Sequence, residues 1–350
     1  MKTAKKPLLS ICIATFNRGN FIKETIDSIL SQNNELVEII IVDGASIDQT
    51  QEILSNYATK YDNLYYYREQ LNSGVDGDYD KAVKYAKGEY CWLMTDDDIL
   101  KDDSIAYLIG ILKLNKDLVV VNSEVWNSNL TKDLKTKMIN IPIDKNYSKD
   151  DEREMFIDIA TCISFIGSVI IKKQIWIERN REIYYGTLFV HVGVIFQQPF
   201  ANGVYLVSKT ILKIRYGNSM WTPKSFEIWY YKWPKLIWSF DRFDNIAKNK
   251  IVTKEPWRRI FSLLKSRAMG DYTFNEYKVH ISKNSLSPLK FISYLVSITN
   301  PKILNLILVI SYMIFKPSAK YTLFDLLRSK HCISITKRLA KIFNFDLLGK

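Results

Sequence analysis

Short apolar runs alternate with amphipathic segments over the first third of the chain. Five runs are rich in apolar or β-branched residues and are predicted to be strands: 8–16, 37–46, 64–70, 90–98 and 118–126. The segments between them carry apolar residues at helical spacing and are predicted to be helices: 20–31, 48–60, 75–87 and 103–115. Alternating strands and helices predict an α/β fold with a largely parallel sheet covered by helices on both faces.

Polar residues follow the first four of these strands. In open α/β sheets, ligands bind beyond the carboxyl ends of the strands, where loops converge. This rule selects four segments before any motif is considered: Thr15–Arg18, Asp43–Ser46, Asn72–Asp80 and Asp96–Asp98. A ligand site is therefore expected at one edge of the sheet.

The chain changes character in its second half. Residues 129–160 are polar and predict a connecting loop with a helix starting near Asp150, and two further strands are predicted at 162–173 and 203–215. Beyond them, 220–240 is dense in Trp, Tyr and Lys. We place a domain boundary near residue 218, which separates an α/β domain, 1–218, from a basic, aromatic and mainly helical region, 219–350.

One apolar segment lies near the C-terminal end. Residues 301–317 read "PKILNLILVISYMIFKP", and the apolar core is shorter than the roughly 20 residues that a membrane-spanning helix requires. Two interpretations stay open: a helix packed against the protein, which we slightly favour, or a helix lying in a membrane interface among basic neighbours.

The formal net charge of +12 is concentrated in the second half. Residues 201–350 hold 26 Lys and Arg against 8 Asp and Glu, whereas residues 1–200 hold 23 against 29. A basic surface could face nucleic acid, anionic lipid or a phosphate-bearing substrate. The cations are interleaved with apolar runs and no nucleic-acid motif is present, so a membrane surface fits better and no nucleic-acid partner is expected.

Cysteine usage and the N-terminal segment suggest a location. The four cysteines lie far apart in the sequence and form no metal-type pair, which predicts free thiols in a reducing compartment. The N-terminal apolar stretch is short and lacks a small-residue cleavage site, so it is not typical of a signal peptide. We expect a cytoplasmic protein.

Three adjacent acids, Asp96–Asp98, follow the fourth predicted strand. They could cap the next helix in a solvated loop, or they could together bind a divalent cation. Asp43 could accept a hydrogen bond from a nucleotide or only begin a turn with Gly44. The chain has no glycine-rich phosphate loop, so dinucleotide-binding and P-loop chemistry lose support. A nucleotide-diphosphate ligand with a cation satisfies both acidic sites, and we favour it.

Three ordered motifs resemble one enzyme family. "SICIATFNR" is similar to a first strand ending in [P/A]-T-[Y/F]-N-R, "IIIVDGASIDQT" to a second-strand acidic motif, and "AKGEYCWLMTDDDIL" to a segment ending in D-D-x-L. Together they resemble the family 2 glycosyltransferases with the GT-A fold over roughly residues 7–200. The last motif and "GVDGDYDKAVKY" look closest to the branch that includes abequosyltransferase-like enzymes.

The resemblance implies a donor pocket and a metal site. The residues that it assigns to the nucleotide-sugar donor are Thr15, Arg18, Asp43, and either Asp76 or Asp80. The acids Asp96, Asp97 and Asp98 correspond to the metal-binding motif, with Mg²⁺ or Mn²⁺ as the expected cofactor. Thr95 stands where many relatives carry an acid, so which two of the three carboxylates bind the metal stays open.

The resemblance also implies an inverting displacement in which a base deprotonates the acceptor hydroxyl. The acidic pair that relatives often carry in the segment after the sheet is absent from 182–194. His191 is the preferred candidate base, with Glu182 and Asp158 as alternatives. From its position at the end of a predicted strand, Arg215 is a candidate to cover the diphosphate.

The resulting hypothesis is an inverting, metal-dependent glycosyltransferase that acts in bacterial surface-polysaccharide synthesis. Its expected partners are a nucleotide-sugar donor and a lipid-linked glycan acceptor, at the inner face of the cell membrane. Three alternatives stay open at this stage: a sugar nucleotidyltransferase, a non-catalytic nucleotide- or glycan-binding protein, and a nucleic-acid-binding protein.

Overall fold

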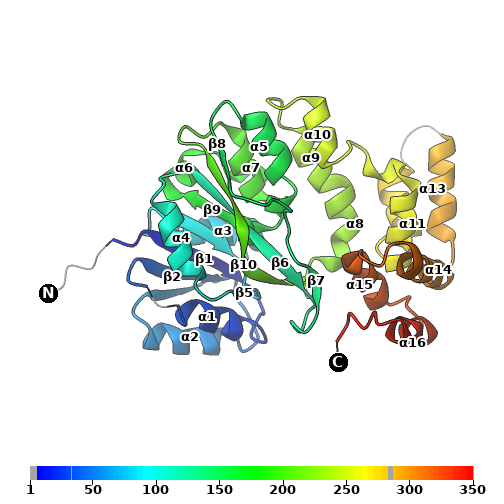
Figure 1. The fold of residues 1–350 in the computed structure, drawn as a ribbon, viewed down its shortest axis with the longest axis horizontal. Coiled ribbons are helices and arrows are strands. Elements are labelled where there is room, and N and C mark those ends of the chain that lie inside the picture. The colour runs from blue at the N-terminus through cyan, green and yellow to red at the C-terminus, as the bar shows by residue number, and fades with distance from the viewer. Residues whose placement is uncertain (1–5, 33, 283–286, 350) are drawn as a thin grey trace. The chain divides into compact units, whose positions relative to one another are not determined.

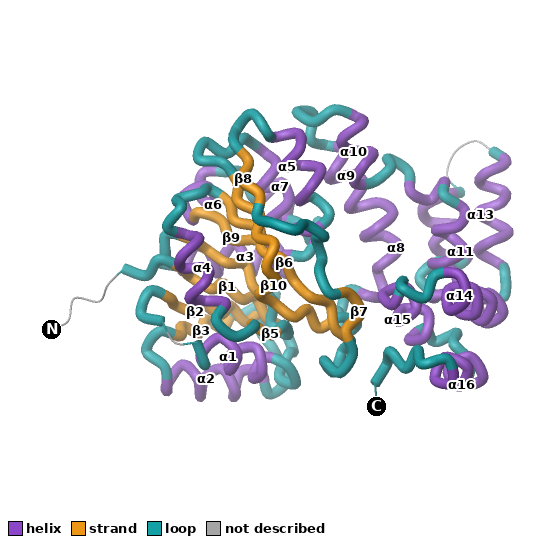
Figure 2. The backbone as a smooth tube through the Cα atoms, in the orientation of Figure 1, coloured by secondary structure: helices purple, strands orange, loops and turns teal. Residues whose placement is uncertain are grey.

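The computed structural model describes residues 6–32, 34–282 and 287–349 and is drawn in Figures 1 and 2. The chain divides into two compact units. The first comprises 1–124, 137–214 and 242–247, and the second comprises 125–136, 215–241 and 248–350. The predicted boundary near residue 218 therefore falls inside a segment of the second unit.

A single sheet organises the first unit (Figure 2). The strands are β1 Leu9–Thr15, β2 Val37–Asp43, β3 Leu64–Arg68, β4 Tyr90–Met94, β5 Ile99–Leu100, β6 Leu118–Trp126, β7 Asp133–Lys135, β8 Lys145–Tyr147, β9 Val169–Lys172 and β10 Val204–Arg215. Their order is β3-β2-β1-β4-β9-β6-β10-β5, with β7 paired to β6 and β8 paired to β10. The order confirms the predicted mixed α/β architecture.

The sheet changes direction at β9. Strands β3, β2, β1 and β4 are parallel to one another. In contrast, β9 runs antiparallel to both β4 and β6, and β10 runs antiparallel to β5 and β8. The predicted parallel arrangement thus holds for the first four strands, and the fifth predicted strand, now β6, lies beyond the reversal.

Helices cover the sheet because their apolar faces pack on it. The helices of the first unit are α1 Ile22–Leu30, α2 Thr50–Lys60, α3 Gly74–Tyr85, α4 Ser104–Leu112, α5 Glu152–Ile159, α6 Lys173–Glu178 and α7 Val190–Gln197. Ile22, Ile26 and Ile29 of α1 are buried, as their helical spacing predicts, and join a core formed with the strands β1, β2 and β4. The α3 helix is different, since it buries three aspartates, Asp76, Asp78 and Asp80.

The prediction of a strand at 162–173 is only partly confirmed. Only Val169–Lys172 is extended, while Cys162–Ser164 and Ile166–Ser168 form 3₁₀ turns. The Ser168 hydroxyl donates to the carbonyl of Phe165 at 2.7 Å, a local bond that competes with strand pairing. Apolar composition alone does not reveal this competition.

The second unit is mainly helical, as expected. Its helices are α8 Ser225–Glu227, α9 Trp233–Trp238, α11 Ile260–Met269, α12 Phe274–Glu276, α13 Pro288–Ile298, α14 Pro301–Phe315, α15 Lys320–Arg328 and α16 Ser334–Ile342, and α10 Asn245–Ile251 crosses the division between the units. An aromatic-rich core holds the unit, with Phe226, Trp257 and Tyr272 at its centre.

Within the described residues, no single helix has both the length and the apolar character to cross a bilayer. One pair of helices, α13 and α14, meets the requirement jointly by length and composition, but the two are bent by 97°.

Candidate active site

The strand register brings the predicted loops to one edge of the sheet. Thr15 is the register partner of Asp43, which in turn is the partner of Arg68, and Ile13 pairs with Met94, the last residue of β4. The ends of β1, β2, β3 and β4 are therefore adjacent. The structure thus brings together the donor candidates Thr15, Arg18 and Asp43 and the acids that follow Met94.

Two of these loops are tied to each other by polar contacts. The backbone amide of Asn17 donates to the Ser46 hydroxyl at 2.8 Å, and the Asn17 side chain accepts from the amide of Ile47 at 2.8 Å. Asn17 and Ala45 both have positive φ, 53° and 64°. Such backbone conformations are unfavourable for residues other than glycine and cluster at functional sites, so the loops are built to a specific shape.

Arg18 ties the first loop to the acidic loop. Its Nε donates to Asp96 at 3.1 Å, and its Nη2 forms a short ion pair with Asp97. The guanidinium also stacks over the Phe21 ring, 4.8 Å from the centroid. The Arg18 side chain is only 8% exposed, so both ion pairs are largely screened from water. Asp98 instead accepts from the Thr95 hydroxyl.

The acidic loop carries more negative charge than Arg18 offsets. Three carboxylates face one guanidinium, and burial together with the neighbouring Asp97 raises the pKa of Asp96 to about 6, against the opposing effect of Arg18. Burial, and then the three acids, also raise the pKa of Tyr79 well above its ordinary value. Its hydroxyl donates to the carbonyl of Met94, directly below the loop.

The acidic loop has the ligand chemistry of a divalent-cation site. Carboxylate oxygens are the ligands that Mg²⁺ and Mn²⁺ prefer, and Asp96, Asp97 and Asp98 supply them. The three carboxylates together carry more negative charge than Arg18 neutralises. Over 6–32, 34–282 and 287–349, however, no three Asp, Glu, His or Cys side chains already converge as a metal cluster. Arg18 and Thr95 engage the same oxygens instead. The residue types fit a divalent cation, which would compete with Arg18 and Thr95 for these oxygens.

Asp43 lies completely buried at the end of β2. One carboxylate oxygen accepts from the amide and hydroxyl of Ser46, at 2.9 and 2.5 Å, and the other accepts from the Tyr66 hydroxyl at 2.7 Å. These bonds stabilise the turn from Asp43 to Ser46. Starting this turn is one of the two roles that the sequence suggests for Asp43. The Asp43 contacts also hold the Tyr66 hydroxyl, whose pKa is raised by burial and by Asp43, at the same strand end.

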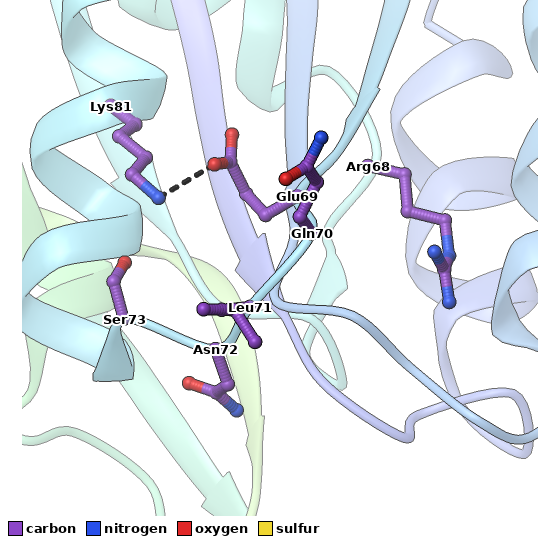
Figure 3. Close-up of a pocket in the computed structure, with 7 residues that line it drawn as sticks. All are labelled: Arg68, Glu69, Gln70, Leu71, Asn72, Ser73 and Lys81. Carbon is purple, nitrogen blue, oxygen red and sulfur yellow. Dashed lines mark hydrogen bonds and ion pairs between the residues drawn. The ribbon is translucent and has the colours of Figure 1, made fainter.

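A pocket of about 620 Å³ lies at the carboxyl end of β3 (Figure 3). It is lined by the last residue of β3, by the loop that follows and by one residue of α3: Arg68, Glu69, Gln70, Leu71, Asn72, Ser73 and Lys81. Lys81 pairs with Glu69 at 2.7 Å, and the amide of Glu69 donates to the Asp43 carbonyl at 2.9 Å. Apart from Asn72 and Ser73, which fall in a loop chosen by the strand-end rule, sequence reasoning missed this lining.

Asp78, rather than Asp76 or Asp80, contacts residues that line the pocket. The Ser73 hydroxyl donates to its carboxylate at 2.5 Å, and Lys81 lies 3.8 Å away. A Cβ on Gly44 would stand 2.7 Å from an Asp78 oxygen, which places this carboxylate against the end of β2. Burial raises the pKa of Asp78. The helical spacing of the three aspartates puts Asp76 and Asp80 on another side of α3.

Asp76 and Asp80 hold a distant segment in place. Asp76 accepts from the amides of Leu188 and Val190, at 2.8 and 3.0 Å, and so satisfies donors at the start of α7. Asp80 is buried among four donors: Trp176, Arg181, Tyr185 and Lys84. Burial opposes its ionisation, but these contacts outweigh it and lower the pKa. Their contacts are structural, and the predicted donor role has no geometric support.

The contacts described below for the three candidate bases do not involve the acidic loop. His191 is 1% exposed, its Nε2 lies 2.7 Å from the Ile163 carbonyl, and burial lowers its pKa to about 4. Asp158 accepts from Lys145 at 2.6 Å and from Tyr147 at 2.7 Å. Glu182 is exposed in a 3₁₀ turn. Burial disfavours His191 as a base because a buried imidazole resists protonation.

Arg215 ends β10 and belongs to the second unit. Its Nη1 donates to the Ser128 carbonyl at 3.1 Å, a contact within the same unit. The side chain is 7% exposed. The predicted role over a diphosphate stays a prediction.

Comparison with known proteins assigns this site to a family. Residues 10–172, which contain β1 to β4 and the acidic loop, match the model of glycosyl transferase family 2. Residues 10–172 are a family 2 glycosyltransferase domain. The three sequence motifs that suggested this family lie within the match, so the resemblance is confirmed and the protein is a glycosyltransferase.

Several curated proteins are similar to this glycosyltransferase. The abequosyltransferase RfbV of Salmonella typhimurium is 28% identical over 230 residues, which cover 62% of this chain and 69% of the relative. An uncharacterised glycosyltransferase of Rickettsia typhi is 39% identical over 116 residues, about a third of each protein. The poly(ribitol-phosphate) beta-glucosyltransferase of Bacillus spizizenii is 27% identical over 207 residues, 58% of this chain and 30% of the relative.

Solved structures share the fold of this glycosyltransferase. S. aureus TarS, residues 1–349 in complex with UDP, superposes with a TM-score of 0.54 at 15% identity and covers 91% of this chain and 89% of that one. The mannosyltransferase PcManGT of Pyrobaculum calidifontis gives a TM-score of 0.51 at 14% identity and covers 97% and 88%. These matches confirm the predicted GT-A architecture.

Proposed function

We propose that this glycosyltransferase moves a sugar from a nucleotide-diphosphate donor to a glycan acceptor in the synthesis of a bacterial surface polysaccharide. The observation that carries the proposal is the meeting of the Arg18–acidic loop pair, Asp43 and the 620 Å³ pocket at one edge of the sheet. TarS has been solved with UDP and with UDP-GlcNAc, and PcManGT with GDP-Man and Mn²⁺, which supports a nucleotide-sugar donor. The abequosyltransferase and poly(ribitol-phosphate) relatives support a polysaccharide product.

Two groups of residues would bind two different parts of the donor, the nucleoside and the diphosphate. The pocket beyond β3 offers Asn72 and Lys81 to the nucleoside. Behind its lining, Asp78 contacts Ser73 and Lys81, and the Asp43 carbonyl accepts from the amide of Glu69. Arg18 supplies a fixed guanidinium toward the diphosphate, a geometry suited to phosphate oxygens.

Asp96, Asp97 and Asp98 would hold the divalent cation. When bound, the cation offsets the negative charge of the departing nucleoside diphosphate. A cation at these carboxylates would also release Arg18 toward the phosphates, because the metal replaces the guanidinium as their counter-charge. Donor and metal are therefore expected to bind cooperatively.

The proposed reaction is a single inverting displacement. The acceptor oxygen forms a bond to the anomeric carbon as the bond from that carbon to the diphosphate oxygen breaks, and the acceptor proton passes to a base. Among the three predicted bases, Glu182 is the exposed one, whereas His191 is buried and Asp158 is paired with Lys145 and Tyr147. We therefore prefer Glu182 for this role.

We further propose that the acceptor is lipid-linked and that the enzyme works at the inner face of the cell membrane. Residues 201–350 hold 26 Lys and Arg against 8 Asp and Glu, and such an excess favours anionic lipid phosphates. This part of the proposal concerns the setting of the reaction and not its chemistry.

A nucleotide-sugar screen tests the proposed donor and metal. The melting temperature of the full chain is measured with UDP-, GDP-, CDP- and dTDP-sugars, each with Mg²⁺, with Mn²⁺ and with EDTA. We expect one nucleotide class to raise the melting temperature only with metal, and Asp98→Asn to lose this response. Asp102→Asn, an exposed carboxylate four residues further on, is the control and should respond as the wild type. If no nucleotide stabilises the protein, or if Asp98→Asn responds normally, the proposal fails.

A further inference from the structure

The α14 helix is apolar on two opposite faces, and only one of them is buried. Leu308, Val309 and Tyr312 pack into the second unit. Ile303, Ile307 and Ile314 instead lie 56–63% exposed, at helical spacings of four and seven residues. A helix of a water-exposed protein normally turns a polar face outward. The exposed row of isoleucines therefore needs an apolar partner.

The preceding helix has the same property. In α13, Ser293, Val296 and Ser297 are buried, while Phe291, Leu295, Ile298 and their neighbour Ile292 are 39–60% exposed. Phe291, Leu295 and Ile298 are spaced four and three residues apart, which aligns them along one side of the helix. Two consecutive helices of the second unit thus present apolar rows outward. Phe315, at the end of α14, is 77% exposed and extends the second row.

The segment that contains these rows is basic, and lysines flank α14. The described residues 287–349 contain nine Lys and Arg and only two acids, Asp325 and Asp346. Lys302 and Lys316 lie at the two ends of α14 and are exposed. Apolar residues flanked by lysines at both helix ends are typical of helices that lie in the interface of an anionic membrane. A second copy of this chain would bring an equal excess of cations to the same place, which disfavours it as the partner.

Helix length excludes a single crossing. At 1.5 Å per residue, the 15 residues of α14 extend about 22 Å, less than the roughly 30 Å of a bilayer's hydrocarbon core. The 97° bend between α13 and α14 also prevents the pair from acting as one straight rod. A helix that lies along the surface needs neither length nor straightness.

We propose that the exposed rows of α13 and α14 are a membrane-docking surface that inserts into the interface of an anionic phospholipid bilayer. The proposal deepens the proposed function and rests on it for its setting, since a lipid-linked acceptor would be presented at the same bilayer. It assigns the membrane contact to the helices α13 and α14, and not only to the net positive charge of residues 201–350.

Vesicle flotation tests the docking surface without donor or acceptor. The full chain is mixed with vesicles of phosphatidylcholine alone or with phosphatidylglycerol added. We expect flotation with the anionic vesicles only. The double variant Ile307→Gln/Ile314→Gln should bind at least tenfold more weakly, because both apolar anchors are lost. The control Ile143→Gln/Ile246→Gln changes two isoleucines of the first unit that are 72% and 67% exposed, and it should float as the wild type.

Several outcomes would overturn this inference. Unchanged flotation of the α14 variant would exclude the isoleucine row, and equal binding to neutral vesicles would exclude the anionic partner. Resistance to carbonate extraction would favour insertion across the bilayer. A dimer that the α14 variant converts to a monomer, with no vesicle binding, would assign the row to a second copy. Unchanged circular dichroism of each variant checks folding. A failure here with a normal nucleotide response leaves the transferase proposal intact.

Discussion

Arg18 connects the architecture of the acidic loop to its chemistry. The side chain is buried against the Phe21 ring and is the counter-charge of both Asp96 and Asp97. The same two carboxylates are candidates for the cation. The guanidinium and the cation therefore compete for one set of oxygens.

This competition predicts opposite effects of Arg18→Ala on stability and on metal affinity. Without metal the variant should lose about 3 kcal/mol of unfolding free energy, because buried carboxylates lose their counter-charge. Its Mn²⁺ affinity in the absence of nucleotide should rise, and added Mn²⁺ should restore much of the stability. Calorimetric titration and chemical denaturation measure the two quantities. Lys23→Ala removes an exposed pair with Asp27 and should change neither by much. Weaker Mn²⁺ binding by the Arg18 variant would refute the competition.

His191 should make the protein sensitive to acid rather than serve the reaction. Its folded pKa of about 4 lies below the ordinary 6.5, so the unfolded chain takes up a proton first as the pH falls. Stability is therefore full above pH 6.5 and is lost progressively toward pH 4, by about 3 kcal/mol. His191→Asn should flatten this part of the profile in denaturation measurements, while transfer at neutral pH falls only as far as folding does. A loss of transfer by a stably folded variant would restore His191 as the base.

At the scale of elements, α3 serves two regions of the first unit through different sides. Lys81 lines the pocket and Asp78 contacts Lys81 and Ser73, whereas Asp76 and Asp80 bind the segment 173–197. A helix that buries three aspartates is costly unless each one is partnered, and the contacts of Asp76 and Asp80 meet that requirement.

Two substitutions in α3 should separate these roles. Asp76→Ala removes the acceptor for two amides at the start of α7 and should cost about 1–2 kcal/mol of stability, with donor affinity unchanged in the folded fraction. Asp78→Asn should instead weaken nucleotide binding with little loss of stability. Thermal denaturation and calorimetric titration of both variants check the prediction. If Asp76→Ala weakens nucleotide binding and Asp78→Asn does not, Asp76 is the donor-binding residue.

The two roles of α3 also show which parts of the site can be predicted from the sequence and which cannot. The strand-end rule found the edge of the site because apolar runs and their polar ends are local features, and β1 to β4 formed close to their predicted bounds. It could not choose among Asp76, Asp78 and Asp80, because the choice depends on which side of α3 meets β2. The burial of His191 could not be predicted for a related reason: it depends on the packing of α7, which no local pattern reveals.

At the scale of the whole molecule, each unit has its own buried polar centre. In the second unit, Asp325 accepts from the Tyr216 hydroxyl at 3.1 Å, and burial raises its pKa to about 7. The acidic loop is the corresponding centre of the first unit.

Asp325 should lower the stability of the second unit at alkaline pH. Its folded pKa lies above the ordinary 3.8, so the native state holds the proton more tightly and stability falls as the pH rises from 4 to 7. Asp325→Asn should remove this fall and be more stable than the wild type at pH 8, by an amount on the order of 3 kcal/mol. Denaturation curves at pH 5 and pH 8 measure it, and nucleotide affinity should not change. A variant less stable at pH 8 than at pH 5 would contradict the prediction.

The bonds from Asp76 and Asp80 to the segment 173–197 restrict how enzymes of this kind can be recombined. Suppose that this segment is exchanged for the one from a relative to alter acceptor choice, and α3 is left unchanged. Asp76 and Asp80 would then face unmatched partners, and each buried carboxylate would have lost its donors. A workable chimera must transplant α3 together with the segment, although about 90 residues separate them in the chain and α3 also borders the donor pocket. Under the proposed function, a chimera that changes this segment therefore also changes a helix that lines the donor pocket.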